Sequence, residues 1–162
     1  MKKIITSAIL FLLLGCVSAM AQLPSATLKN ALGKKVNATS ISNDGQPFIV
    51  SFFATWCPPC MNELATISKV YDDWRKQTGV KIFSVSVDQP SDEAKVYALF
   101  ERSNYSYELL LDQEGKFAQA MKVSSIPHMF LFDGKGKLVY THVGFSNGDE
   151  AELLEKIKAA KK

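Results

Sequence analysis

The sequence is poor in cysteine, nearly balanced in charge and without an apolar run long enough to span a membrane. Only 3 of its 162 residues are Cys, and its 19 Lys and Arg against 16 Asp and Glu give a net charge of +3. A chain this close to neutral does not resemble a nucleic-acid-binding domain, so we expect no nucleic-acid partner. Internal repeats and low-complexity tracts are also absent from the sequence, and 47% hydrophobic with 22% charged residues suits one globular domain.

The N-terminus has the pattern of a targeting signal. Two lysines precede an apolar run at residues 4–14, which is shorter than the roughly 20 residues that a membrane-spanning helix needs. Residues 19–21, Ala-Met-Ala, then supply the small-x-small pattern that signal peptidase cleaves. The sequence therefore predicts a signal peptide over residues 1–21 and an exported, periplasmic domain over residues 22–162. The alternative is a lipobox, Leu-Leu-Gly-Cys, in which Cys16 carries a lipid anchor.

Two cysteines remain outside this leader, in the motif Cys57-Pro58-Pro59-Cys60. A disulfide between them would close a loop too small to add much stability through chain entropy. A zinc site usually needs four ligands, and the only other soft candidates are the two histidines. We therefore interpret the motif as a redox-active pair and expect no metal and no cofactor beyond the Cys57–Cys60 disulfide.

Apolar periodicity predicts an α/β domain around this motif. Buried strands are indicated at residues 48–54 and 80–87, a further strand at 107–111, and a hairpin of residues 129–132 and 138–143 around the turn at 133–136. Helices are indicated from Cys60 to Gly79, from a Ser91 cap to about Arg102, over residues 116–121 and after an Asn147 cap. The cysteine pair therefore lies where a strand passes into a helix.

The two cysteines have different surroundings at such a junction. Cys57 lies at the start of the helix, where unpaired N–H groups and the helix dipole stabilise a thiolate over a thiol. Pro58 and Pro59 suit the first helical turn, because the N–H groups that they lack would have no partner there. Cys60 lies one turn further along and is better shielded. We therefore expect Cys57 to attack a disulfide and Cys60 to resolve the mixed disulfide that forms.

Residues 52–60, Phe-Phe-Ala-Thr-Trp-Cys-Pro-Pro-Cys, resemble the active site of the thioredoxin superfamily, and more narrowly that of its exported TlpA/ResA-type thiol–disulfide oxidoreductases. Residues 123–127 resemble the cis-proline loop of that family. The resemblance implies a thioredoxin fold, with a central mixed sheet flanked by helices, an extra strand–helix insertion and a short N-terminal extension. It also implies that the Ile126–Pro127 bond is cis and that Trp56 borders a substrate groove beside the cysteines.

Three residues near these motifs carry separate hypotheses. Cytoplasmic thioredoxins have a buried Asp at the position that Ser51 occupies, and the resemblance implies instead that Glu63 takes the proton of Cys60, one helical turn away. A surface glutamate that complements the helix N-terminus is the alternative for Glu63. His128 stands where many relatives have Thr, and it either polarises the cysteines, contacts substrate or faces solvent. We expect its imidazole to be largely neutral at pH 7.

The resemblance implies a protein-disulfide reductase of the cell envelope. Its clients would be disulfide-containing envelope proteins such as apo-cytochrome c, a membrane thiol protein would donate its electrons, and it would act as a monomer. The alternatives are an envelope disulfide oxidase or isomerase, a copper-delivery protein and a peroxidase. A copper protein would need Cys-x-x-x-Cys, one residue longer than this motif, and a peroxidase would need Pro where this chain has Val50.

Overall fold

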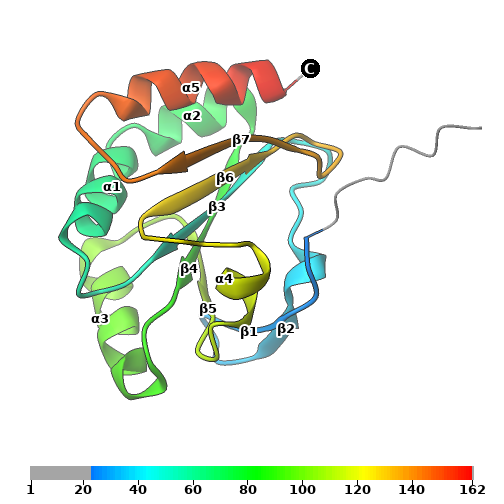
Figure 1. The fold of residues 1–162 in the computed structure, drawn as a ribbon. Helices are drawn as coiled ribbons and strands as arrows, with labels where there is room; N and C mark the ends of the chain where they lie inside the picture. Colours follow the sequence, from blue (N-terminus) through cyan, green and yellow to red (C-terminus); the bar gives the residue numbers. More distant parts are fainter. Residues whose placement is uncertain (1–22, 162) are drawn as a thin grey trace, which may run out of the picture.

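A mixed sheet of seven strands organises residues 23–161, the part of the chain that this computed structural model describes (Figure 1). The strand order across the sheet is β2-β1-β5-β4-β3-β6-β7. In chain order the elements are β1 (Thr27–Asn30), β2 (Lys35–Asn37), η1 (Ala38–Ser40), β3 (Phe48–Phe53), α1 (Pro58–Ser68), α2 (Tyr71–Thr78), β4 (Lys81–Ser86), η2 (Pro90–Asp92), α3 (Glu93–Ser103), β5 (Glu108–Leu111), α4 (Lys116–Ala120), β6 (His128–Phe132), β7 (Leu138–Val143) and α5 (Asp149–Ala160). The predicted signal peptide, with Cys16, lies outside the described residues. Within residues 23–161, no helix has both the length and the apolar character needed to cross a membrane.

The centre of the sheet consists of parallel strands that are buried on both faces. β3 pairs in parallel with β4, from Phe48 opposite Lys81 to Phe53 opposite Ser86, and β4 pairs in parallel with β5. Every residue of β3 is buried, which explains its nearly continuous apolar sequence. β6 and β7 extend the sheet beyond β3 with antiparallel pairing. Because β3 and β4 run in the same direction, their carboxyl ends meet at one edge of the sheet.

Alternate residues of the strands supply two apolar cores, one on each face of the sheet. From β3, Ile49 and Phe53 join the core under α1, α2, α3 and α5, whereas Phe52 joins the core under α4 and the N-terminal segment. The ring centroids of Phe52 and Phe117, which belongs to α4, are 5.3 Å apart. Figure 1 shows α4 on the opposite side of the sheet from α1, α2 and α5. The helix that follows the cysteine motif, α1, therefore shares its face of the sheet with α2, α3 and α5, opposite α4.

The expected thioredoxin fold is confirmed, with α3 and β5 as the strand–helix insertion. The N-terminal extension forms a hairpin of β1 and β2, two strands that were not predicted from the sequence. These strands have four and three residues and no clear apolar alternation. β1 pairs with β5, and Lys29 Nζ lies 2.7 Å from Glu93 Oε2 of α3. The hairpin therefore depends on contacts with the insertion, which no local pattern reveals.

The prediction of one helix from Cys60 to Gly79 is wrong. The chain breaks at Lys69 and Val70 into α1 and α2. Near the break the Ser68 hydroxyl donates to a backbone carbonyl of the last turn of α1, a contact that competes with helical hydrogen bonding. Both helices direct apolar residues into the same core, so the break lets them follow the surface of the sheet.

Two predicted helix caps are also wrong. Ser91 lies inside the short 3-10 helix η2, and α3 begins only at Glu93. Gly148, not Asn147, takes the N-cap position of α5. The side chain of Asn147 instead accepts a hydrogen bond from Asn62 of α1 at 3.2 Å, so a tertiary contact replaces the local cap.

Candidate active site

A disulfide joins Cys57 and Cys60 at the N-terminus of α1. Cys57 takes the N-cap position with extended backbone angles, and its Sγ accepts a hydrogen bond from the Cys60 N–H at 3.3 Å. Pro58 and Pro59 occupy the first two helical positions, where a missing N–H costs no hydrogen bond. The predicted strand-to-helix junction and the placement of both prolines in the first turn are confirmed.

The two cysteines differ in their access to solvent. Cys57 keeps 4% of its surface exposed, whereas Cys60 is 0% exposed. The carbonyl oxygen of Ile126 lies 3.7 Å from Cys57 Sγ, and the Ile126–Pro127 bond is cis, as the resemblance implied. Trp56, immediately before the pair, is 67% exposed. The structure therefore places the cis-proline loop beside Cys57, the more exposed cysteine of the pair.

The carboxyl group of Glu63 lies in the core. The residue is 2% exposed and shares the buried face of α1 with Cys60. Its Oε1 lies 2.5 Å from the hydroxyl oxygen of Ser51 on β3. Burial raises the pKa of Glu63 to about 7; the hydrogen bond from Ser51 opposes this rise, and the negative charge of Asp149 adds to it. The surface alternative is wrong, and a carboxyl with this pKa can exchange a proton near neutral pH.

His128 is buried at the start of β6, so the solvent-facing alternative is wrong. Its imidazole stacks on Phe130 with 4.2 Å between ring centroids, and within residues 23–161 its Nδ1 has no hydrogen-bond partner. Burial lowers the pKa of His128, and the neighbouring His142 lowers it further, which favours neutral imidazole at pH 7. Phe130 belongs to the α4 face of the sheet, so His128 and Glu63 lie on opposite faces. In this described part of the chain, no three His, Cys, Asp or Glu side chains come close enough to hold a metal ion.

A buried carboxylate that was not predicted from the sequence, Asp88, lies just after β4 and is 3% exposed. The Thr55 N–H donates to its Oδ2 at 3.0 Å, and the Thr55 hydroxyl donates to its Oδ1 at 2.6 Å. The Ser86 hydroxyl donates a further hydrogen bond at 2.8 Å. Because Thr55 lies between β3 and Cys57, Asp88 holds the segment that leads into the disulfide. The position of Asp88 after the second of two predicted parallel strands could have indicated that it lies near the cysteines, because the carboxyl ends of such strands meet at the same edge of the sheet.

Replacing Glu63 with Gln should remove a pH-dependent loss of stability from the oxidised protein. The carboxyl pKa is 4.5 in its ordinary state and about 7 in the fold, so between these values the folded state binds more protons. Below the lower pKa, Glu63 is protonated in both the folded and the unfolded protein, and its contribution to the free energy of unfolding is fully present. That contribution is lost as the pH rises through the upper pKa. In denaturant unfolding, we expect the free energy of unfolding of Glu63→Gln, relative to that of the wild type, to rise by roughly 3 kcal/mol between about pH 4 and about pH 8. Glu101→Gln, on the exposed side of α3, should gain nothing, and parallel pH profiles for wild type and Glu63→Gln would contradict the prediction.

Replacing Asp88 with Asn should loosen the segment before Cys57, because an amide nitrogen cannot accept hydrogen bonds. Amide hydrogen exchange at Thr55 should be about tenfold faster or more. Asp112 offers a matched control, since it is 1% exposed, follows β5 and accepts hydrogen bonds from two backbone N–H groups at the start of α4. Asp112→Asn should accelerate exchange in α4 and leave Thr55 unchanged. Unchanged protection of Thr55 in Asp88→Asn would show that the carboxylate does not hold this segment.

Comparison with known proteins agrees with this geometry. Sporulation thiol-disulfide oxidoreductase A of Bacillus subtilis is 31% identical over 106 residues, which cover 65% of this chain and 64% of that protein's length. Thiol-disulfide oxidoreductase ResA of Geobacillus thermodenitrificans is 29% identical over 136 residues, 83% of this chain and 75% of that protein.

Solved structures show the same fold. The solution structure of an uncharacterized thioredoxin-like protein from Porphyromonas gingivalis matches with a TM-score of 0.78 and 47% identity, over 86% of this chain and 92% of that one. Residues 20–141 match the AhpC/TSA family. The chain therefore belongs to the AhpC/TSA family, as a thioredoxin-fold relative of the ResA-type thiol–disulfide oxidoreductases.

Proposed function

We propose that this chain is an exported thiol–disulfide oxidoreductase that reduces disulfides in envelope proteins. The observation that carries the proposal is the Cys57–Cys60 disulfide at the N-terminus of α1, in which Cys57 alone of the pair keeps exposed surface. A thiolate at a helix N-terminus is stabilised by the backbone N–H groups and the helix dipole, and it is the nucleophile in disulfide exchange. The names of the Bacillus and Geobacillus relatives support the same activity.

The reaction starts from the reduced pair. The Cys57 thiolate attacks a client disulfide, forms a mixed disulfide and releases one client sulfur as a thiolate. Cys60 then gives its proton to Glu63, and its thiolate attacks Cys57 Sγ. The bond between Cys57 and the client breaks, its electron pair leaves on the client sulfur, and the Cys57–Cys60 disulfide forms. The client disulfide is reduced to two thiols, and two electrons have left the protein.

The proposed direction of transfer rests on a Cys57 thiolate that has few stabilising groups beyond the N-terminus of α1. Pro58 and Pro59 have no N–H to offer it, so the observed donor to Sγ is the N–H of Cys60. His128 is favoured in its neutral form and adds no positive charge nearby. A less stabilised thiolate makes the reduced form the better electron donor.

A reductase in an oxidising compartment needs a continuous source of electrons. We propose a membrane thiol protein as that donor and disulfide-containing envelope proteins, apo-cytochrome c among them, as clients. Export would depend on the signal peptide predicted at residues 1–21, and the protein would act as a monomer.

Cys60→Ser should accumulate mixed disulfides between Cys57 and client proteins, because the resolving thiol is missing. Non-reducing gels of envelope extract, followed by identification of the attached proteins, would detect these adducts and name the clients. Cys57→Ser is the matched control and should trap few or none. Recovery of the same adducts from Cys57→Ser would reverse the assigned roles.

Equilibration of the purified domain with glutathione should give a reduction potential well below about −120 mV, the value of the strong oxidant DsbA. A potential near that of DsbA would instead identify an oxidase or isomerase. Turnover of hydrogen peroxide above a no-enzyme blank would favour the peroxidase alternative, and stoichiometric Cu(I) binding would favour copper delivery.

A further inference from the structure

The two oxygens of the buried Glu63 carboxyl have different surroundings. Oε1 lies 2.5 Å from the Ser51 hydroxyl, whereas Oε2 is buried and has no hydrogen-bond partner within residues 23–161. Glu63 and Ser51 are each 2% exposed. Because a hydroxyl donates one hydrogen bond, Ser51 engages one carboxylate oxygen and leaves the other available.

We propose that Ser51 is the positioning residue of Glu63: its hydroxyl holds Oε1 against β3 and leaves Oε2 as the oxygen that exchanges a proton with the Cys60 thiol. The proposal rests on the thiol–disulfide activity proposed above and adds the group that orients the base. Ser51 acts through Glu63 and takes no proton itself.

The geometry of α1 makes Cys60 and Glu63 neighbours on one face of the helix. Cys60 and Glu63 are separated by about one turn on the buried face of α1. Side chains of an α-helix lean toward its N-terminus, so Glu63 leans back over the turn that holds Cys60. In the resolving step the proton passes from Cys60 Sγ to Oε2, and the thiolate forms the bond to Cys57. The client sulfur leaves with the electron pair of the broken bond.

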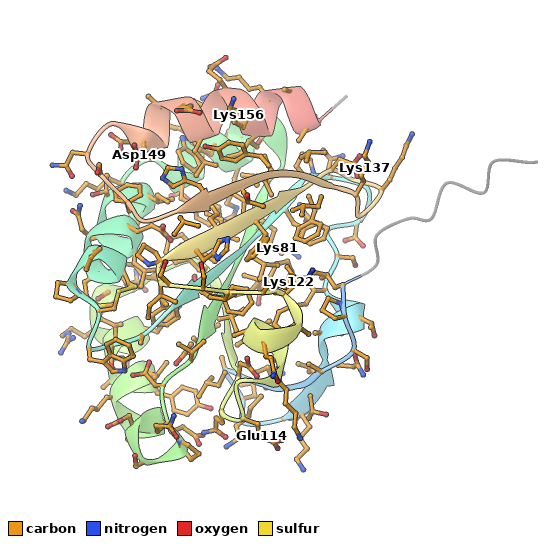
Figure 2. The ribbon with its side chains drawn as sticks, in the orientation of Figure 1. Lys81, Glu114, Lys122, Lys137, Asp149 and Lys156 are labelled. Atoms are coloured by element: carbon orange, nitrogen blue, oxygen red, sulfur yellow. A yellow bond between two sulfur atoms is a disulfide. The ribbon has the colours of Figure 1, made fainter. Side chains whose placement is uncertain are left out.

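Among the groups that face Glu63, Ser51 is the one whose contact favours the charged carboxylate. Asp149, labelled in Figure 2 at the start of α5, raises the pKa of Glu63, as burial does, whereas the Ser51 hydrogen bond lowers it. His142 holds Asp149 in turn, with Nε2 3.1 Å from Oδ2. Tyr107, before β5, donates its hydroxyl to a backbone carbonyl of α1. On its own helix, Glu63 shares the buried face with Cys60.

The sheet offers a matched control for Ser51. Ser84 lies directly opposite Ser51 in the parallel β3–β4 register and is 0% exposed. Its hydroxyl has no hydrogen-bond partner in the described part of the chain. The two serines therefore share residue type, sheet face and burial, and they differ in contact with Glu63.

The experiment compares Ser51→Ala, Ser84→Ala and Ser51→Thr in two measurements on the full domain. NMR titration of the Glu63 side-chain carboxyl carbon in the reduced protein gives the midpoint of its ionisation. Stopped-flow kinetics gives the pH dependence of the resolving step. Ser51→Ala should raise the midpoint by about one pH unit and slow resolution about tenfold at neutral pH, with recovery at higher pH. Ser51→Thr, which keeps the hydroxyl, should retain the wild-type values, and Ser84→Ala should change neither.

Equal midpoints in Ser51→Ala and Ser84→Ala would overturn the proposal, as would a shifted midpoint with an unchanged pH profile of resolution. Ser51→Cys, which keeps the volume but donates weakly, provides the same comparison where the alanine variant does not fold. Failure of the proposed function is recognised separately, because Cys60→Ser would then trap no mixed disulfides through Cys57, whatever the Glu63 midpoint.

Discussion

Parallel pairing of β3 with β4 is the constraint on which the rest of the structure depends. It brings the carboxyl ends of both strands to one edge of the sheet, so that Asp88 after β4 reaches Thr55 after β3. It also sets Ser51 beside Ser84 on the face under α1, where Ser51 meets Glu63. A slip of one residue in β3 would turn Ser51 to the other face of the sheet. The start of α1, the segment before Cys57 and the buried polar contact therefore all depend on one register.

Two carboxyl groups near the disulfide lose their hydration on burial, and the fold compensates this loss differently for each. Asp88 receives hydrogen bonds from a backbone N–H and two hydroxyls, which replace the water that it loses on burial. Glu63 receives one, from Ser51, and its pKa rises to about 7. The first arrangement suits a group that holds the chain in place, and the second suits a group that gains and loses a proton. The number of donors therefore distinguishes the carboxylate that holds the chain, Asp88, from Glu63, whose pKa lies near neutrality.

The parts of the fold that could be predicted are those with strong local patterns. β3 and β4 read as buried strands because both faces of each strand are covered, and the cysteine motif was correctly placed at the junction with α1. The β1–β2 hairpin could not be predicted, because its strands are short and its stability comes from β5 and α3. The break between α1 and α2 was missed for a related reason, since apolar spacing continues across it while the backbone follows the sheet.

The sequence by itself determined the chemistry of the pair, because Cys57 and Cys60 are three residues apart and their order along a helix already makes them unequal. It also limited Glu63 to one helical turn from Cys60, which left open whether the carboxyl faced solvent or the core. Only the tertiary structure decided that question, since the burial of Glu63 and the approach of Asp149 come from β3 and α5, far away in the chain. The same holds for His128, whose pKa is lowered because packing against the sheet buries its imidazole. Ionisation depends on the dielectric surroundings and the charges within a few ångströms, and these are properties of the packed chain rather than of any local segment.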